Sequence, residues 1–159
     1  MGNIVRNKEA VGFLILTSLL ALTFTVSILY ADSKGGVIDN VSWYVEVSAP
    51  VYNSFLETTT SSHYVYLFNN TNAPIYYTYE FKHGIDGWAL STTDMHSGWL
   101  GAGELLSRSN TLVVDVSSIP PSNPPSKYTA RAYSRVQFGP NPDNQNFPPK
   151  AEETADFYR

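Results

Sequence analysis

An uncharged apolar segment near the N-terminus constrains the fold of this 159-residue chain more than any other feature. No charged residue occurs from Ala10 to Ala31, and twelve of the twenty residues from Val11 to Tyr30 are Leu, Ile, Val or Phe. As a helix, residues 10–31 would span about 33 Å, which matches a hydrocarbon layer about 30 Å thick. The segment therefore predicts one transmembrane helix, and the rest of the chain suffices for one domain.

The charges that flank this segment predict its orientation. Arg6 and Lys8 precede it, whereas Asp32 and Lys34 follow it. The positive-inside rule then places residues 1–9 in the cytoplasm and exports the remainder. A cleaved signal peptide is the alternative, because Ala31 is a small residue suited to cleavage before Asp32, and the domain would then be secreted. The apolar run is longer than the roughly 7–15 residues of a signal peptide, which favours a retained anchor.

The sequence beyond the anchor shows the period-two alternation of β-strands. We expect residues 32–37 to form a flexible linker and residues 38–159 to form the domain. From Val41 to Ser48, apolar Val and Trp residues alternate with Ser, Tyr and Glu. That pattern is typical of an antiparallel strand with one buried face.

Further strands follow at spacings typical of hairpins, and no helix is expected after the anchor. The stretch 88–104 is rich in Gly, so we expect it to be irregular, with one short strand near Trp88–Ser91. This arrangement predicts an all-β, antiparallel two-sheet sandwich. The remaining expected strands are His63–Phe68, Ile75–Lys82, Thr111–Ser117, Lys127–Phe138 and an edge strand at Ala155–Tyr158.

Composition argues against a nucleic-acid partner and excludes any bond or site that needs cysteine. The formal net charge is −4 and the pI is near 5.2, whereas a nucleic-acid-binding face needs clustered basic residues. The chain has no cysteine, so it forms neither disulfides nor thiolate metal sites.

Part of the C-terminal half resembles a known class of surface domain. The resemblance lies in Ser97-Gly98-Trp99-Leu100-Gly101-Ala102-Gly103-Glu104, the strand Leu112–Ser117, the corner Ile119-Pro120-Pro121 and the strand start Tyr128-Thr129-Ala130. These motifs resemble the C-terminal half of many bacterial and archaeal immunoglobulin-like (fibronectin III-like) surface domains. They cover about 40 of the 159 residues, and Pro121–Ser126 replaces the usual Pro-Gly before the Tyr. The resemblance implies an immunoglobulin-like antiparallel sandwich in an extracellular setting, and it implies no particular activity.

The search for catalytic chemistry finds no strong motif. No Gly-x-Ser-x-Gly elbow and no phosphate loop occurs, so we expect a non-catalytic protein without a cofactor. His83, Asp86, Asp94 and His96 would surround a divalent metal ion if their two loops met in space, although such residues are more often turn formers. His63 is expected to be a solvated residue at the start of its strand.

Aromatic residues are the main candidates for contact with a ligand or partner. Trp88 and Trp99 lie in the Gly-rich stretch, where they either present flat rings to a ligand or cover the core of the sandwich. Tyr76, Tyr133 and Tyr44 alternate onto outward strand faces, where they would form a contact patch. Asn40 and Asn69 also lie in N-glycosylation sequons.

Three functions remain open at this stage. The first is a membrane-anchored extracytoplasmic module for adhesion, envelope scaffolding or a membrane complex, whose partner is a protein or a surface glycan. The second is a homo-oligomeric surface filament that assembles by strand donation, with Asp32–Asn40 or Ala151–Arg159 as the donated segment. The third is a small metal-dependent binder or enzyme.

Overall fold

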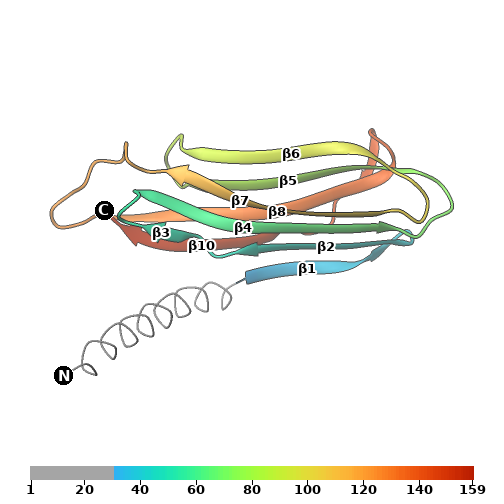
Figure 1. Ribbon diagram of the computed structural model, residues 1–159, viewed down its shortest axis with the longest axis horizontal. Coiled ribbons are helices and arrows are strands. Elements are labelled where there is room, and N and C mark those ends of the chain that lie inside the picture. The colour runs from blue at the N-terminus through green and yellow to red at the C-terminus, as the bar shows by residue number, and fades with distance from the viewer. Residues whose placement is uncertain (1–30) are drawn as a thin grey trace, which may run out of the picture. The chain divides into compact units, whose positions relative to one another are not determined.

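The computed structural model describes residues 31–159, which form two stacked antiparallel β-sheets (Figure 1). This confirms the predicted all-β, two-sheet architecture, and residues 31–159 contain no helix. Accordingly, none of the described residues forms a helix long and apolar enough to cross a membrane. The predicted anchor lies outside the described residues except for Ala31, which is the first residue of the first sheet.

The first sheet is built around its longest strand. Strand β4 (Thr58–Asn69) lies between β2 (Val41–Ser48) and β7 (Leu105–Asp115), and β1 (Ala31–Ile38) pairs with the outer side of β2. The short strand β3 (Val51–Asn53) follows β2 and pairs with the start of β4. The edges of this sheet are therefore β7 on one side, and β1 with the short strand β3 on the other.

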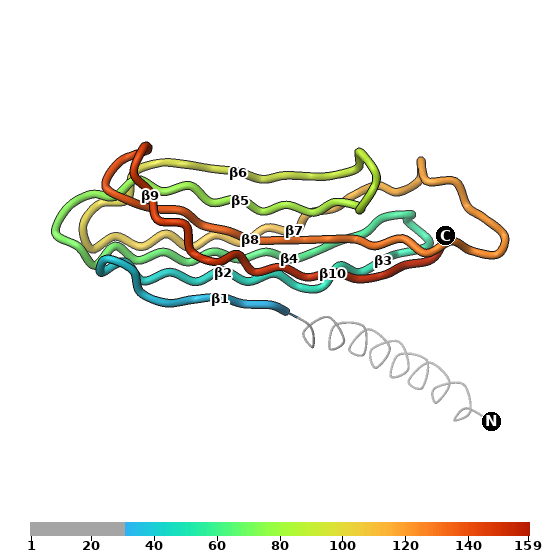
Figure 2. Tube along the Cα trace, turned by 180° about the vertical axis from the view of Figure 1, so that it is seen from behind, coloured from blue at the N-terminus to red at the C-terminus, as the bar shows by residue number. Residues whose placement is uncertain are grey.

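The second sheet has the strand order β10-β8-β5-β6 (Figure 2). Strand β5 (Ile75–Ile85) lies between β6 (Ser91–Leu100) and β8 (Lys127–Asn141), and β10 (Ala151–Tyr158) pairs with the first half of β8. Strand β9 (Asn144–Asn146) folds back on the end of β8. The free edge of β6 lies on the same side of the sandwich as the free edge of β7 (Figure 1).

The core lies between the two sheets, where the inward faces of the strands meet. In β2 the predicted alternation is confirmed, because Val41, Trp43, Val45 and Val47 are buried while the residues between them are partly exposed. Small inward residues on β8 allow the sheets to approach closely. The other large buried side chains of this cluster are Val65, Leu67, Ile75, Tyr79, Phe81, Leu100, Leu106, Leu112, Val136 and Phe138.

Two segments differ from the sequence expectation. Residues 32–37 do not form a linker, since they belong to β1 and pair with β2 along its whole length. A two-residue turn closes this hairpin, with Asp39 and Asn40 at φ 50° and 63°, as a type I′ turn requires. The stretch 88–104 is not irregular, because β6 occupies ten of its residues and begins only at Ser91. Both strands lie at sheet edges, where one side of the backbone has no strand partner.

Candidate functional site

A groove is open along the side of the sandwich where the edge strands β6 and β7 approach each other. Two hydrogen bonds bridge the edges, one from Thr92 Oγ1 to the Val113 carbonyl oxygen (2.8 Å) and one from Asn110 Nδ2 to Asp94 Oδ2 (2.7 Å). The cavity has a volume of about 420 Å³. Its lining comes from three strands and includes Tyr77 and Tyr79 of β5, Asp94 and His96 of β6, and Arg108 and Ser109 of β7.

Strand pairing and alternation bring the aromatic side chains of this groove together. Tyr77 and Tyr79 both point inward from β5, and their ring planes are parallel to within 2° with centroids 6.5 Å apart. His96 lies opposite Tyr79 in the β5–β6 ladder, with ring centroids 5.4 Å apart. Gly98 lies opposite Tyr77, and a Cβ atom at Gly98 would come within 3.3 Å of the tyrosine hydroxyl. The glycine therefore leaves room for the Tyr77 ring beside β6.

The groove also contains charged groups. His96 Nε2 lies 2.9 Å from Asp94 Oδ1, so this carboxylate interacts with both a ring nitrogen and the Asn110 amide. Burial raises the pKa of the Tyr79 phenol, and the nearby Asp94 charge raises it further. Arg108 donates from Nη1 to the neighbouring Ser107 carbonyl (2.9 Å), and no carboxylate of residues 31–159 lies within 4.0 Å of its guanidinium. The groove thus combines flat rings with a cation that has no acidic partner among these residues.

A second polar feature is a chain of hydrogen bonds through the interior between the sheets. Ser61 joins two histidines, since its Oγ lies 2.8 Å from His63 Nε2 and 2.8 Å from His83 Nδ1. Thr59 Oγ1 lies 3.0 Å from His83 Nε2 at one end of the chain. At the other end, His63 Nδ1 lies 3.0 Å from Ser134 Oγ. All five side chains are buried.

The hydrogen bond that Ser134 makes at the end of this series fixes which atom donates in every other hydrogen bond of the series. Ser134 Oγ donates to the carbonyl oxygen of Glu46 (2.7 Å), so Ser134 must accept a proton from His63 Nδ1. A neutral His63 then accepts at Nε2 from the Ser61 hydroxyl. The Ser61 hydroxyl has no second proton, so His83 must donate to it from Nδ1. The other nitrogen of His83, Nε2, then accepts from the hydroxyl of Thr59. Both rings therefore carry their proton on Nδ1 when neutral.

Burial determines the charge of the two interior histidines. Desolvation, together with the positive charge of a protonated His83, lowers the pKa of His63 to about 4. Desolvation likewise lowers the pKa of His83 to about 4, although the Leu112 carbonyl favours the protonated ring. Both rings are therefore neutral at pH 7, which agrees with the hydrogen-bond directions derived above.

The expectation for His63 is wrong. It is not a solvated residue at a strand start, because β4 begins at Thr58 and the His63 side chain is only 2% exposed. The reason is the alternation of β4, which places Thr59, Ser61 and His63 on the same inward face as Val65.

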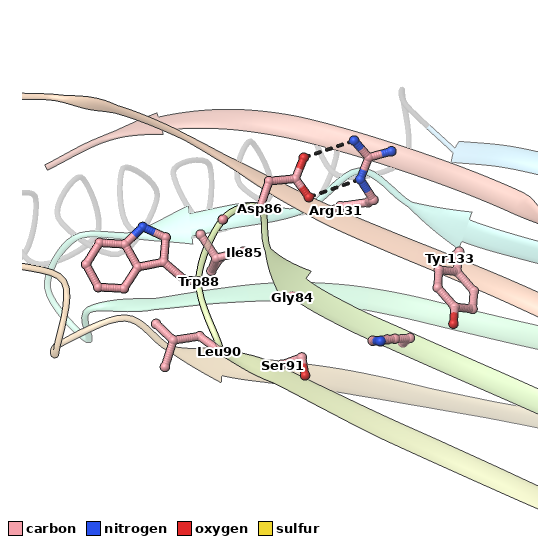
Figure 3. A pocket seen from close by; sticks show the side chains of 10 residues that line it. Gly84, Ile85, Asp86, Trp88, Leu90, Ser91, Arg131 and Tyr133 are labelled. Carbon is pink, nitrogen blue, oxygen red and sulfur yellow. Dashed lines mark hydrogen bonds and ion pairs between the residues drawn. The ribbon is translucent and has the colours of Figure 1, made fainter.

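A smaller pocket of about 280 Å³ lies on the second sheet beside the β5–β6 loop (Figure 3). Arg131 donates from Nε and Nη2 to the two carboxylate oxygens of Asp86, at 3.1 and 2.9 Å. A third donor, Nη1, contacts Glu152 Oε1 at 2.5 Å. The ion pair lowers the pKa of Asp86. The arginine of this pocket is therefore already neutralised, unlike Arg108 in the groove.

The four candidate metal ligands lie in three different places. His83 is in the interior chain, Asp86 pairs with Arg131 in the smaller pocket, and Asp94 and His96 contact each other in the groove. Within residues 31–159, no three His, Asp or Glu side chains form a group suited to a metal ion.

The four candidate contact aromatics lie in two places, with Trp99 beside Tyr76 and with Trp88 and Tyr133 both lining the smaller pocket. Trp99 is 57% exposed on β6, with its ring edge-on to Tyr76 at 5.4 Å. Trp88 is 41% exposed beside the smaller pocket, so neither tryptophan belongs to the buried core. Tyr133 donates its hydroxyl to Glu80 Oε1 (2.8 Å), and the pKa of Tyr133 is raised to about 12 by burial and this bond.

The sequence analysis did not identify the groove residues on β5 and β7. Tyr77 and Tyr79 alternate onto one face of the expected strand Ile75–Lys82, but nothing in that alternation indicated that this face opens to solvent at β6. Arg108 lay outside every expected strand. Arg108 lines the groove only because β6 and β7 approach each other. Residues that contact each other across these strands, such as Asp94 and Asn110, are 16 positions apart in sequence.

One of the two sequons is inaccessible in the fold. Asn69 is fully buried, and its Nδ2 donates to the carbonyl oxygens of Ala73, Leu100 and Gly101 at 2.8–3.0 Å. Its Oδ1 accepts from the backbone and the hydroxyl of Thr71. Asn40 is exposed in the β1–β2 turn.

Comparisons with known proteins give no family assignment. No protein-family model and no curated protein matches the chain. A solved structure described as "Crystal structure of protein from Archaeoglobus fulgidus" is 12% identical, with a TM-score of 0.38, over 81% of this chain and 94% of that one.

Proposed function

We propose that this protein is a non-catalytic binding module of the immunoglobulin-like class, anchored in a membrane by residues 10–31 and displayed outside the cytoplasm. Its ligand site is the groove between β6 and β7, and its ligand is an anionic surface glycan. The observation that carries the binding role is the position of Arg108, a cation without an acidic partner among the described residues, beside tyrosine rings.

The strand connectivity supports the immunoglobulin-like class. Successive strands β4 and β5 belong to different sheets, yet β4 pairs with β7 and β5 pairs with β8. Such pairing of strands three apart arises when the chain crosses repeatedly between two sheets, as in Greek-key sandwiches. The anchor is supported by the uncharged stretch from Ala10 to Ala31.

The chemistry of the groove favours an acidic sugar. A guanidinium binds a carboxylate through two parallel hydrogen bonds, so Arg108 suits a uronic acid. Flat aromatic rings suit the apolar face of a sugar ring, and Asp94 with Ser109 offers partners for hydroxyl groups. The volume of about 420 Å³ lies within the range of about 300–1,000 Å³ typical of small-ligand sites.

Strand donation has less support. Both candidate donor segments are already paired within the chain, since residues 31–38 pair with β2 and residues 151–158 pair with β8. Neither segment is spare in the folded domain, so assembly by donation would first require one of these ladders to open.

Fractionation tests the anchor. Cells that express the chain with a C-terminal tag should yield a full-length product, verified by intact mass, in the membrane fraction. The tag should be digested by protease added outside the cytoplasm. A soluble product that starts near Asp32 would contradict the anchor and would leave a secreted domain.

Affinity electrophoresis tests the ligand. Mobility of the protein should fall in gels that contain polygalacturonate and stay unchanged in gels that contain dextran. Arg108→Ala should weaken binding about 10- to 100-fold, because a charge-assisted hydrogen bond contributes about 1.5–3 kcal/mol. Lys150→Ala removes the same charge elsewhere on the surface and should bind like the wild type. Equal losses in both variants, or no retardation by polygalacturonate, would contradict the proposal.

A further inference from the structure

Strand β6 has a free backbone edge without the features that usually prevent an edge from pairing. It pairs with β5 along its whole length without a shift in register, and no strand of residues 31–159 pairs with its other side. Alternate N–H and C=O groups of such an edge point away from the sheet, where they can pair with a further strand. Edge strands are commonly protected by Lys, Pro or a bulge, and β6 has none of these.

The edge of β6 is also accessible. It is the outermost strand on its side of the sandwich, and β7 of the other sheet lies further in (Figures 1 and 2). One carbonyl of β7, that of Val113, already accepts a hydrogen bond from Thr92 Oγ1. On the opposite side of the sandwich, Asp32 of β1 accepts from the backbone amide of Glu152 of β10 at 3.0 Å, which joins those two edges. The backbone of β6 is therefore open to a further strand.

The inward face of β6 is complementary in charge to an antiparallel copy of itself. Asp94 and His96 are its only titratable residues, and both lie on the inward face, opposite Phe81 and Tyr79 of β5. If two copies of β6 pair about Met95, each Asp94 lies opposite the His96 of the other copy. Opposite charges across a ladder stabilise it, and an imidazole can also donate a hydrogen bond to a carboxylate.

The neighbouring registers lack this complementarity. A pair centred on Asp94 would place two carboxylates opposite each other, and like charges in that position are destabilising. A pair centred on His96 would place two imidazoles opposite each other. The register centred on Met95 is therefore favoured over the two beside it.

The outward face of β6 supports the same register. Met95 is 62% exposed and Trp99 is 57% exposed. The pair centred on Met95 places the two methionines opposite each other and each Trp99 opposite Ser91 of the other copy. Methionine is unbranched and flexible, so two such side chains can pack together across the centre of the pair. Pairing would then bury apolar surface that is exposed in the single chain.

We propose that a second copy of this chain pairs with β6, antiparallel and centred on Met95. The two copies are related by a two-fold axis perpendicular to the sheet, which joins their second sheets into one continuous sheet. Both copies use the same edge, so the contact closes at two chains. The axis keeps both inward faces on the same side, so the two β6–β7 grooves lie next to each other and include two Arg108 side chains. Only this last consequence rests on the proposed function.

The absence of cysteine from the sequence allows a test by disulfide formation. The sample is the purified full-length chain with Met95→Cys in a non-ionic detergent, oxidised with copper phenanthroline and analysed on non-reducing gels. Residues directly opposite in an antiparallel ladder have Cα atoms about 4.5–5.5 Å apart, which suits a disulfide. The control is Val37→Cys, which is 67% exposed on the edge strand β1. We expect the disulfide dimer of Met95→Cys to form about 10-fold faster than that of the control.

Two further sets of variants test the register. Thr93 lies opposite Ser97 of the other copy, so a mixture of Thr93→Cys and Ser97→Cys chains of different tag size should form the mixed dimer faster than either forms its own. His96→Glu places a carboxylate opposite Asp94, and the dimer measured by sedimentation equilibrium should weaken about 10-fold, because two like-charge pairs arise. Adding Asp94→Lys to His96→Glu makes both pairs opposite in charge again and should restore the dimer.

Three results would overturn the pairing. They are equal rates of disulfide formation at positions 95 and 37, self-pairing at positions 93 and 97 as fast as mixed pairing, and sedimentation of the wild type as a monomer at every concentration or as species larger than a dimer. Retardation by polygalacturonate separates this proposal from the proposed function. A monomer that is retarded refutes the pairing alone, whereas a dimer that is not retarded refutes glycan binding and leaves the pairing.

Discussion

Lowering the pH from 7 to 5 should destabilise the sandwich through its two interior histidines. The folded state holds the pKa of His63 and of His83 near 4, whereas an unfolded histidine has a pKa of about 6.5. Between these values the unfolded chain binds protons that the folded chain does not, so the free energy of unfolding falls as the pH falls. From pH 7 to pH 5 the loss is about 2 kcal/mol for each histidine and about 4 kcal/mol for the pair.

Carboxylates contribute little to this particular loss. Ion pairs lower the pKa of Asp86 and Glu152 in the folded state. Their stabilisation is complete above the unfolded pKa of about 4 and is lost only as the pH falls through the lower folded values. A decline between pH 7 and pH 5 therefore reports on the histidines.

Urea unfolding at pH 7, 6 and 5 and constant ionic strength measures the effect. The suitable sample is residues 31–159, which contain both hydrophobic clusters of the sandwich. His96→Asn alters the exposed groove histidine outside the interior hydrogen-bond chain, and the decline caused by the interior pair should persist in this control. NMR titration should also show that the His63 and His83 ring carbons do not titrate above about pH 5. A domain equally stable at pH 7 and pH 5, or one whose dependence survives replacement of both interior histidines by Gln, would refute the reasoning.

Three further predictions concern buried positions. Ser134→Ala leaves the Nδ1–H of His63 unsatisfied and should cost about 1–3 kcal/mol in urea unfolding. Asn69→Ala removes five hydrogen bonds and should cost more than Ser134→Ala in the same assay, while expression in a glycosylating host should add glycan mass only at Asn40. Gly139→Ala would place a Cβ atom 1.9 Å from the Asn144 carbonyl oxygen, so the melting temperature should fall markedly unless the β8–β9 hairpin moves.

The interior strands could be predicted from the sequence because their alternation follows from burial on one face. Strand β2 was expected at Val41–Ser48 and has these bounds. Strands β8 and β5 begin where expected and extend beyond the expected ranges Lys127–Phe138 and Ile75–Lys82. The edge strands β1 and β6 were not expected. Their residues are largely exposed on both faces, so their sequences carry no apolar period.

The polar features could not be predicted for a different reason. A histidine on an inward face is stable only if its partners face it, and one partner of His63, Ser134, lies 71 residues away in sequence on the other sheet. The same holds for the groove, where Asp94 meets Asn110 across the two sheets. Periodicity indicates which face a residue occupies, but it does not indicate what lies opposite.

The directed hydrogen-bond chain also sets how the two sheets are aligned. Apolar contacts are non-directional, so a sandwich held by them alone tolerates sliding of one sheet over the other. A shift of two residues, about 7 Å along the strands, would keep every inward side chain inward. It would, however, separate Ser134 of one sheet from the Glu46 carbonyl and His63 of the other. These few directional hydrogen bonds therefore favour the observed alignment of the sheets over alignments shifted by two residues.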